Sequence, residues 1–248
     1  MRAQSPMILG DLVRIRANEK PDLDVLTFEH LSLDDGRTPD EVRTYADLAT
    51  RSNQIASSLV ARGLARGGRF GLMMRNHPEY VETMAAASIT ATVFVPIDPR
   101  TRGEKLAFFL KRSGCKGIVC ADYCLPALEA VRGSLPALEW ILALETGEGD
   151  DAVPLASVRG AESLREVFSK PVPTVDSRLV DANDPLQIIF TSGTTGDPKG
   201  VVFQNARFGA FAMLSALFGY RPDDRPYTGL SLTHGNAQAV TLGPSLSM

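Results

Sequence analysis

Residues 69–96 read RFGLMMRNHPEYVETMAAASITATVFVP, and this stretch predicts a strand, a helix and a second strand. Arg69–Met74 is a short apolar run typical of a buried strand, and Thr92–Val95 is β-branched and aromatic, with Pro96 closing it. Pro78 suits the first turn of the intervening helix, because the N–H that proline lacks has no partner there. A strand, a helix and a strand in this order predict a parallel pair joined by a right-handed crossover.

The same alternation continues on both sides of this unit. Before it, Thr44 followed by Asp47 forms an acidic capping-box pattern that opens a helix, and Gly63 is a natural stop. After it, we expect a helix through Leu106–Leu110, a strand at Lys116–Cys120, a helix at Leu125–Val131 and a strand at Leu138–Leu144. The alternation predicts an α/β fold with a doubly wound, mainly parallel sheet, flanking helices and ligand sites at the carboxyl ends of the strands.

Composition excludes several classes of partner. The 248 residues have a formal net charge of −3 and no block of like charge, so the chain has no electrostatic footprint for nucleic acid or an anionic membrane. No apolar stretch reaches the roughly 18 residues of a membrane span and no signal peptide is evident, so we expect a soluble, cytoplasmic protein. Cys115, Cys120 and Cys124 are an odd, clustered set, which predicts reduced thiols rather than disulfides or a zinc site.

Three regions follow from the pattern along the chain. Residues 1–144 hold the strand and helix alternation. Residues 145–185 are rich in Gly, Asp and Pro, and we interpret them as a linker-like segment with one short helix near Ser163–Phe168. Residues 186–248 begin with an apolar strand and hold the residues with the most distinctive chemistry.

Leu186–Phe190 predicts a buried strand that runs directly into Thr191-Ser192-Gly193-Thr194-Thr195-Gly196-Asp197-Pro198-Lys199-Gly200, after which Val201–Phe203 resumes a strand pattern. The glycines allow close approach of the backbone, so successive amides can converge on an anion. Four hydroxyls and the charge of Lys199 add donors that suit a polyphosphate. A plain hairpin turn would not need them. The loop is not the NTPase phosphate loop, because Gly200 follows Lys199, and no Gly-x-Gly dinucleotide fingerprint precedes it.

The loop at Thr191–Gly200 resembles the phosphate loop of the acyl-adenylate-forming superfamily, which includes acyl-CoA synthetases, luciferases and peptide-synthetase adenylation domains. Other segments resemble the same family, so the likeness covers nearly the whole chain; they are Asn18–Leu26, Thr44–Leu48, Asn76–Glu79 and Thr92–Pro99. The run Asn236-Ala237-Gln238 after His234 is similar to CoA ligases of the carnitine and crotonobetaine type.

This resemblance implies ATP-dependent activation of a small-molecule carboxylic acid to an acyl-adenylate and then to an acyl-CoA thioester. It implies ATP, Mg²⁺ and coenzyme A, the last as a co-substrate, and it is compatible with a homo-oligomer. The residues that would contact the phosphates are Thr191, Ser192, Gly193, Thr194, Thr195, Gly196 and Lys199. Lys199 and His234 would act in catalysis, His234 at the edge of the acyl pocket, and no metal ligand is assigned in this chain.

The resemblance also implies that residues 1–248 are the incomplete N-terminal portion of the large adenylating domain. The family's magnesium-binding Glu, ribose-binding Asp and C-terminal Lys are not found, and the C-terminal domain is absent. The apolar run Ala239–Leu246 reads as an unfinished helix that should leave core surface exposed. We therefore expect this chain alone to be inactive.

Two other functions remain open at this stage. One is a non-catalytic, truncated nucleotide-binding module, and the other is an adenylation domain that serves an acceptor other than coenzyme A. A nicotinamide- or flavin-dependent oxidoreductase would suit the alternating fold, but the glycine fingerprint after the first strand is missing.

Overall fold

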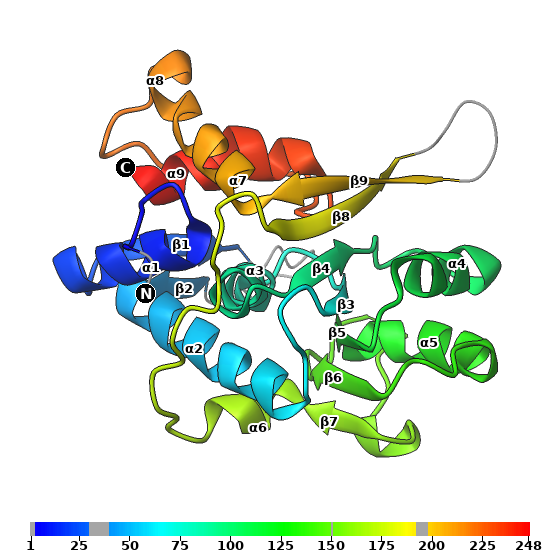
Figure 1. Cartoon of the computed structure of the whole chain (residues 1–248). Helices are drawn as coiled ribbons and strands as arrows, with labels where there is room; N and C mark the ends of the chain where they lie inside the picture. The colour runs from blue at the N-terminus through cyan, green and yellow to red at the C-terminus, as the bar shows by residue number, and fades with distance from the viewer. Residues whose placement is uncertain (1–2, 30–39, 150, 192–197) are drawn as a thin grey trace.

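The computed structural model describes residues 3–29, 40–149, 151–191 and 198–248 (Figure 1). Its centre is a seven-stranded sheet with the order β7-β6-β5-β3-β4-β8-β9. Neighbouring strands are parallel from β7 to β8, and β8 and β9 form an antiparallel pair. The strands are β3 (Arg69–Met73), β4 (Val93–Pro96), β5 (Gly117–Ala121), β6 (Trp140–Leu144), β7 (Ala161–Ser163), β8 (Pro185–Thr191) and β9 (Lys199–Gln204). The predicted doubly wound, mainly parallel sheet is confirmed.

Helices cover both faces of this sheet. α4 (Gly103–Ser113) and α5 (Leu125–Val131) lie together on one face, while α2 (Tyr45–Ala61), α3 (Pro78–Thr90) and α6 (Leu164–Phe168) lie on the other (Figure 1). α1 (Leu9–Glu19) packs against α2 and α3 and buries Leu9, Leu12 and Val13. Every residue of α3 is buried, because α1, α2 and the sheet surround it. Short 3₁₀ turns are η1 (Asp122–Cys124), η2 (Arg132–Ser134) and η3 (Leu155–Ser157).

The predicted helix boundaries near Thr44 and Pro78 are confirmed. The Thr44 hydroxyl accepts a hydrogen bond from the Asp47 amide (3.1 Å), and the Asp47 carboxylate accepts one from the Thr44 amide (3.0 Å). This reciprocal capping box satisfies two N–H groups that the first turn of a helix leaves without partners. Pro78 occupies the first turn of α3. Local chemistry therefore specifies where both helices begin.

Three short strands, β1 (Asp24–Phe28), β2 (Glu41–Thr44) and β7, were not predicted. β7 lies inside the segment interpreted as linker-like and pairs with Ile141–Ala143 of β6 at the edge of the sheet. Its Ala-Glu-Ser sequence has no β-branched or aromatic residue, so only pairing with β6 makes it a strand. Separately, β1 and β2 form a two-stranded antiparallel sheet.

No residue of the C-terminal apolar run Ala239–Leu246 is exposed: Leu242, Gly243, Pro244 and Leu246 are buried and the other four are half-buried, so the predicted exposure of core surface is not observed. This run forms a π-helical segment η4 (Ala237–Leu242) and helix α9 (Gly243–Ser247), which pack against α7 (Asn205–Ala212). Leu246 is fully buried, and its carbonyl accepts a hydrogen bond from the Tyr45 hydroxyl (3.0 Å). Several of the exposed large apolar residues lie on β9 and around α8 (Leu214–Phe218); these are Val201, Val202, Met213, Leu217 and Phe218.

The three cysteines are free and buried, as expected for reduced thiols. Burial raises the pKa of the Cys115 and Cys124 thiols to about 12 in each case. No helix in the described part of the chain combines the length and the apolar character that crossing a bilayer requires.

Candidate active site

The candidate phosphate site lies at the end of the hairpin formed by β8 and β9. The register pairs Thr191 with Lys199 and Phe190 with Gly200, so the two strands bring both ends of the predicted loop together. The Thr191 hydroxyl donates to the Lys199 carbonyl at 3.5 Å. Ser192, Gly193, Thr194, Thr195 and Gly196, which the sequence predicts to contact phosphate, lie outside the described residues.

Both described ends of the loop are accessible to a ligand. Thr191 and Lys199 are exposed. A Cβ added at Gly200 would lie 2.9 Å from Ile188 Cγ2, so a side chain at this position would force Ile188 to move. The glycine therefore allows the close strand approach that holds Lys199 opposite Thr191.

The two faces of β8 have different partners. Phe190 stacks on Phe109 of α4, with ring centroids 4.5 Å apart, and meets the edge of Phe108 at 6.0 Å. Gln187, Ile189 and Thr191 alternate with it and point to the opposite face. The aromatic packing anchors the strand beneath the loop and leaves the Thr191 face for the C-terminal segment.

His234 lies in that C-terminal segment and is exposed. Its amide donates to the Ser231 carbonyl (3.0 Å), which closes a tight turn. A Cβ added to the adjacent Gly235 would lie 3.6 Å from Ile189 Cδ1. Since Ile189 and Thr191 share a face of β8, the turn with His234 lies against the face from which Thr191 projects.

Asp98 and Arg100, just beyond the carboxyl end of β4, were not predicted as site residues. The Arg100 guanidinium donates to both carboxylate oxygens of Asp98, at 3.0 Å through Nε and 2.7 Å through Nη2. These bonds hold the pKa of Asp98 below its usual range, and His234 contributes a smaller electrostatic effect in the same direction. The only signal in the sequence was their position directly after a predicted strand.

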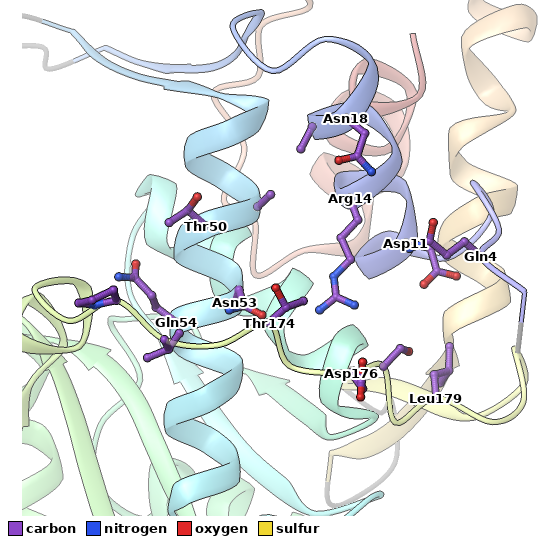
Figure 2. Close-up of a pocket in the computed structure, with 15 residues that line it drawn as sticks. Gln4, Asp11, Arg14, Asn18, Thr50, Asn53, Gln54, Thr174, Asp176 and Leu179 are labelled. Atoms are coloured by element: carbon purple, nitrogen blue, oxygen red, sulfur yellow. The ribbon is translucent and has the colours of Figure 1, made fainter. Parts of the chain in front are cut away.

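A separate cavity of about 630 Å³ lies away from this site, between α1, α2 and residues 171–179 (Figure 2). Its polar side chains mainly hold residues 171–179 in place. Arg14 donates to the Val175 carbonyl, and Asn53 both donates to the Pro173 carbonyl (3.0 Å) and accepts from the Val175 amide (2.8 Å). The cavity therefore lies where residues 171–179 cross α1 and α2, before the chain enters β8.

The described ends of the loop carry a hydroxyl and a cation, groups that bind phosphate in proteins, and the described residues hold no cluster of metal-ligand side chains. Thr191 and Lys199 supply an exposed hydroxyl and an exposed cation at a position that Gly200 keeps open. Within residues 3–29, 40–149, 151–191 and 198–248, no group of three or more His, Cys, Asp or Glu side chains could hold a metal. The Asp98 carboxylate, just beyond β4, is paired with Arg100.

Comparison with known proteins shows the family and the fold of this chain. A long-chain-fatty-acid–CoA ligase of Mycobacterium tuberculosis is 31% identical over 159 residues, which is 64% of this chain and 29% of the relative. A crotonobetaine/carnitine–CoA ligase of Salmonella paratyphi A is 29% identical over 208 residues, 82% of this chain and 39% of the relative. The chain thus spans well under half the length of these curated relatives.

The crystal structure of a long-chain-fatty-acid–CoA ligase from Archaeoglobus fulgidus matches all of this chain and 46% of its own, with a TM-score of 0.78 and 20% identity. The fold is therefore that of the adenylate-forming ligases. The chain itself belongs to the AMP-binding enzyme family, whose model matches residues 13–247.

Proposed function

We propose that the complete natural protein activates a carboxylic acid in two steps and transfers the acyl group to coenzyme A. In the first step, a carboxylate oxygen attacks the α-phosphorus of ATP. The bond from that phosphorus to the bridging oxygen breaks, and the electron pair leaves with pyrophosphate. In the second step, the coenzyme A thiolate attacks the acyl carbon, the bond to the AMP oxygen breaks, and AMP departs.

One observation carries this proposal: a loop of glycines and hydroxyls with one lysine joins β8 to β9 in a chain of the AMP-binding family. Loop amides and the loop hydroxyls would hold the β- and γ-phosphates. Lys199 would neutralise charge as it builds on the departing pyrophosphate. The antiparallel pairing of Thr191 with Lys199 supports this role, because it directs both groups to one end of the hairpin.

His234 would line the acyl pocket. The contact of the adjacent Gly235 with Ile189 supports this position, because Ile189 and Thr191 share a face of β8. An acid held beside His234 would therefore be close to the phosphate loop. Bringing two reactants together in this way supplies a large part of the rate acceleration of many enzymes.

Magnesium, when bound, would neutralise part of the charge on the phosphates. The described residues supply no carboxylate cluster for it, so we assign none of them as a ligand. For the same reason we propose that residues 1–248 alone do not turn over. Acid-dependent AMP release by the purified 248-residue chain, with ATP, magnesium and coenzyme A supplied, would contradict this.

The test of the ligase proposal is acid-dependent ATP–pyrophosphate exchange by the complete natural protein across a panel of carboxylic acids. Lys199→Ala should lower the kcat/KM of the exchange by roughly 30- to 1000-fold, equivalent to about 2–4 kcal/mol of transition-state stabilisation. Lys170→Ala, which removes an exposed lysine outside the loop, is the matched control and should change little. Exchange that is unaffected by Lys199→Ala would refute the assigned role of the loop.

A further inference from the structure

The backbone of Leu232, two residues before His234, is held by side-chain amides on both sides. The Asn76 carbonyl oxygen accepts from the Leu232 amide (2.8 Å), and the Asn76 NH₂ group donates to the Leu230 carbonyl (2.9 Å). On the other side, Gln238 Nε2 donates to the Leu232 carbonyl (2.8 Å). These side chains satisfy backbone groups that a neighbouring strand would otherwise have to satisfy.

Gln238 connects the same point to the strand that leads into the phosphate loop. Gln187 Nε2 on β8 donates to Gln238 Oε1 (2.7 Å), and Gln238 Nε2 donates back to Gln187 Oε1 (3.2 Å). Gln187 is 2% exposed and Gln238 is fully buried. The pair therefore forms a satisfied amide network between two segments that lie 51 residues apart in the sequence.

A buried glutamine pair has an energetic cost that a pair of apolar side chains would not have. Each amide must be desolvated, and the network contributes only if every donor and acceptor finds a partner. Gln238 also lies in the π-helical segment Ala237–Leu242, a rare backbone form that often occurs at functional sites. Its place at the second residue of this segment directs its amide to both Gln187 and the Leu232 carbonyl.

We propose that Gln238 is a positioning residue that sets the location of His234 relative to β8, the strand that leads into the phosphate loop. Gln187 holds Gln238 from β8, and Asn76 holds the backbone of residues 230–232 from the other side. The hydrogen bond between Gln187 and Gln238 holds Gln238 against β8. The hydrogen bond from Gln238 to the Leu232 carbonyl then holds the turn that carries His234. The inference rests on the proposed function for its effect on catalysis. The location of His234 itself can be measured without activity.

The experiment compares Gln238→Met, Gln187→Met and the double variant in the complete natural protein. Methionine keeps the side-chain length but removes the amide. The matched control is Gln54→Met, because Gln54 is also buried and donates two partly buried hydrogen bonds to backbone carbonyls, those of Phe168 and Lys170, away from the site. Three properties are measured: Tm, the kcat and KM of acid-dependent pyrophosphate exchange, and the pH titration of the His234 imidazole by NMR, assigned with His234→Gln.

We expect each single variant, including Gln54→Met, to lower Tm by about 2–6 °C, because buried partners are left unsatisfied. Gln238→Met should also lower kcat/KM for the acid about tenfold and shift the His234 titration, whereas Gln187→Met has a smaller effect on both. The double variant should regain part of the lost Tm, since two unpaired amides are removed together. It should not regain kcat/KM or the native His234 titration, because the Leu232 carbonyl still lacks its donor.

Recovery of activity together with Tm in the double variant would overturn the proposal, since it would indicate a purely structural role. An unchanged His234 titration in Gln238→Met would overturn it as well. If the wild-type protein shows no exchange with any acid, the proposed function fails. The NMR measurement then still decides whether Gln238 positions His234.

Discussion

Glu82 of α3 allows a test of buried charge in this fold. Its carboxyl group is completely buried; Oε1 accepts from Arg43 Nε (2.8 Å), and Oε2 has no hydrogen-bond partner among the described residues. Glu79 lies one turn before Glu82 in α3. Arg51 Nε is 3.9 Å from Glu82 Oε1, farther than Arg43 Nε. Burial and the neighbouring Glu79 raise the pKa of Glu82 to about 8, against the opposing influence of Arg43 and Arg51.

The direction of the pH effect follows from proton binding. Between pH 4.5, the pKa of a free glutamate, and about 8, the folded chain binds a proton at Glu82 that the unfolded chain has lost. The free energy of unfolding should therefore fall as the pH rises through this window. At 1.36 kcal/mol per pH unit, the upper limit of the effect is about 4–5 kcal/mol.

Glu82→Gln should remove this fall in the free energy of unfolding with rising pH. We expect the variant to match the wild type near pH 5, where the carboxyl group is protonated, and to be more stable by a few kcal/mol near pH 8. Urea unfolding followed by the fluorescence of Trp140, the single tryptophan, measures this from pH 5 to 8. The control Glu162→Gln alters an exposed pair with Arg62 and should leave this fall unchanged.

A Glu82→Gln variant that is less stable than the wild type near pH 8 would refute the reasoning. If Glu82 were ionised and paired with Arg43 at pH 8, Glu82→Gln would remove one of the three carboxylate partners of this buried guanidinium, leaving Glu41 and Glu79, and would destabilise the chain.

Three further predictions concern the site and the core. Gly200→Ala should destabilise the chain by about 1–3 kcal/mol because of the 2.9 Å contact with Ile188, whereas Gly133→Ala, with nothing within 4 Å, should not; urea unfolding compares them. The three buried cysteines should resist a thiol reagent at pH 8 in the folded chain and react fully in urea; rapid labelling of the folded chain would contradict the burial. His234→Ala should lower kcat/KM for the acid by about 10- to 200-fold with little change in the KM for ATP, and an equal rise in both KM values would argue against the acyl pocket.

The candidate site was only partly accessible from the sequence. The loop from Thr191 to Gly200 was found because its glycines, hydroxyls and lysine are adjacent in the chain. Asp98 and Arg100 escaped notice, because nothing in their own segment indicates that β4 lies next to β8. The hydrogen bond between Gln187 and Gln238 could not be predicted either, because the sequence around a glutamine in an apolar run indicates neither its burial nor its hydrogen-bond partner.

The sequence by itself determined the order of strands and helices, the helix starts at Thr44 and Pro78, and the position of the loop between two strands. Those features depend on neighbours within a few residues, such as caps, proline geometry and apolar periodicity. Tertiary structure alone decided that β7 is a strand and that the run Ala239–Leu246 packs against α7. Both depend on backbone and side-chain partners that are distant in sequence, and a local pattern holds no information about which segments will meet.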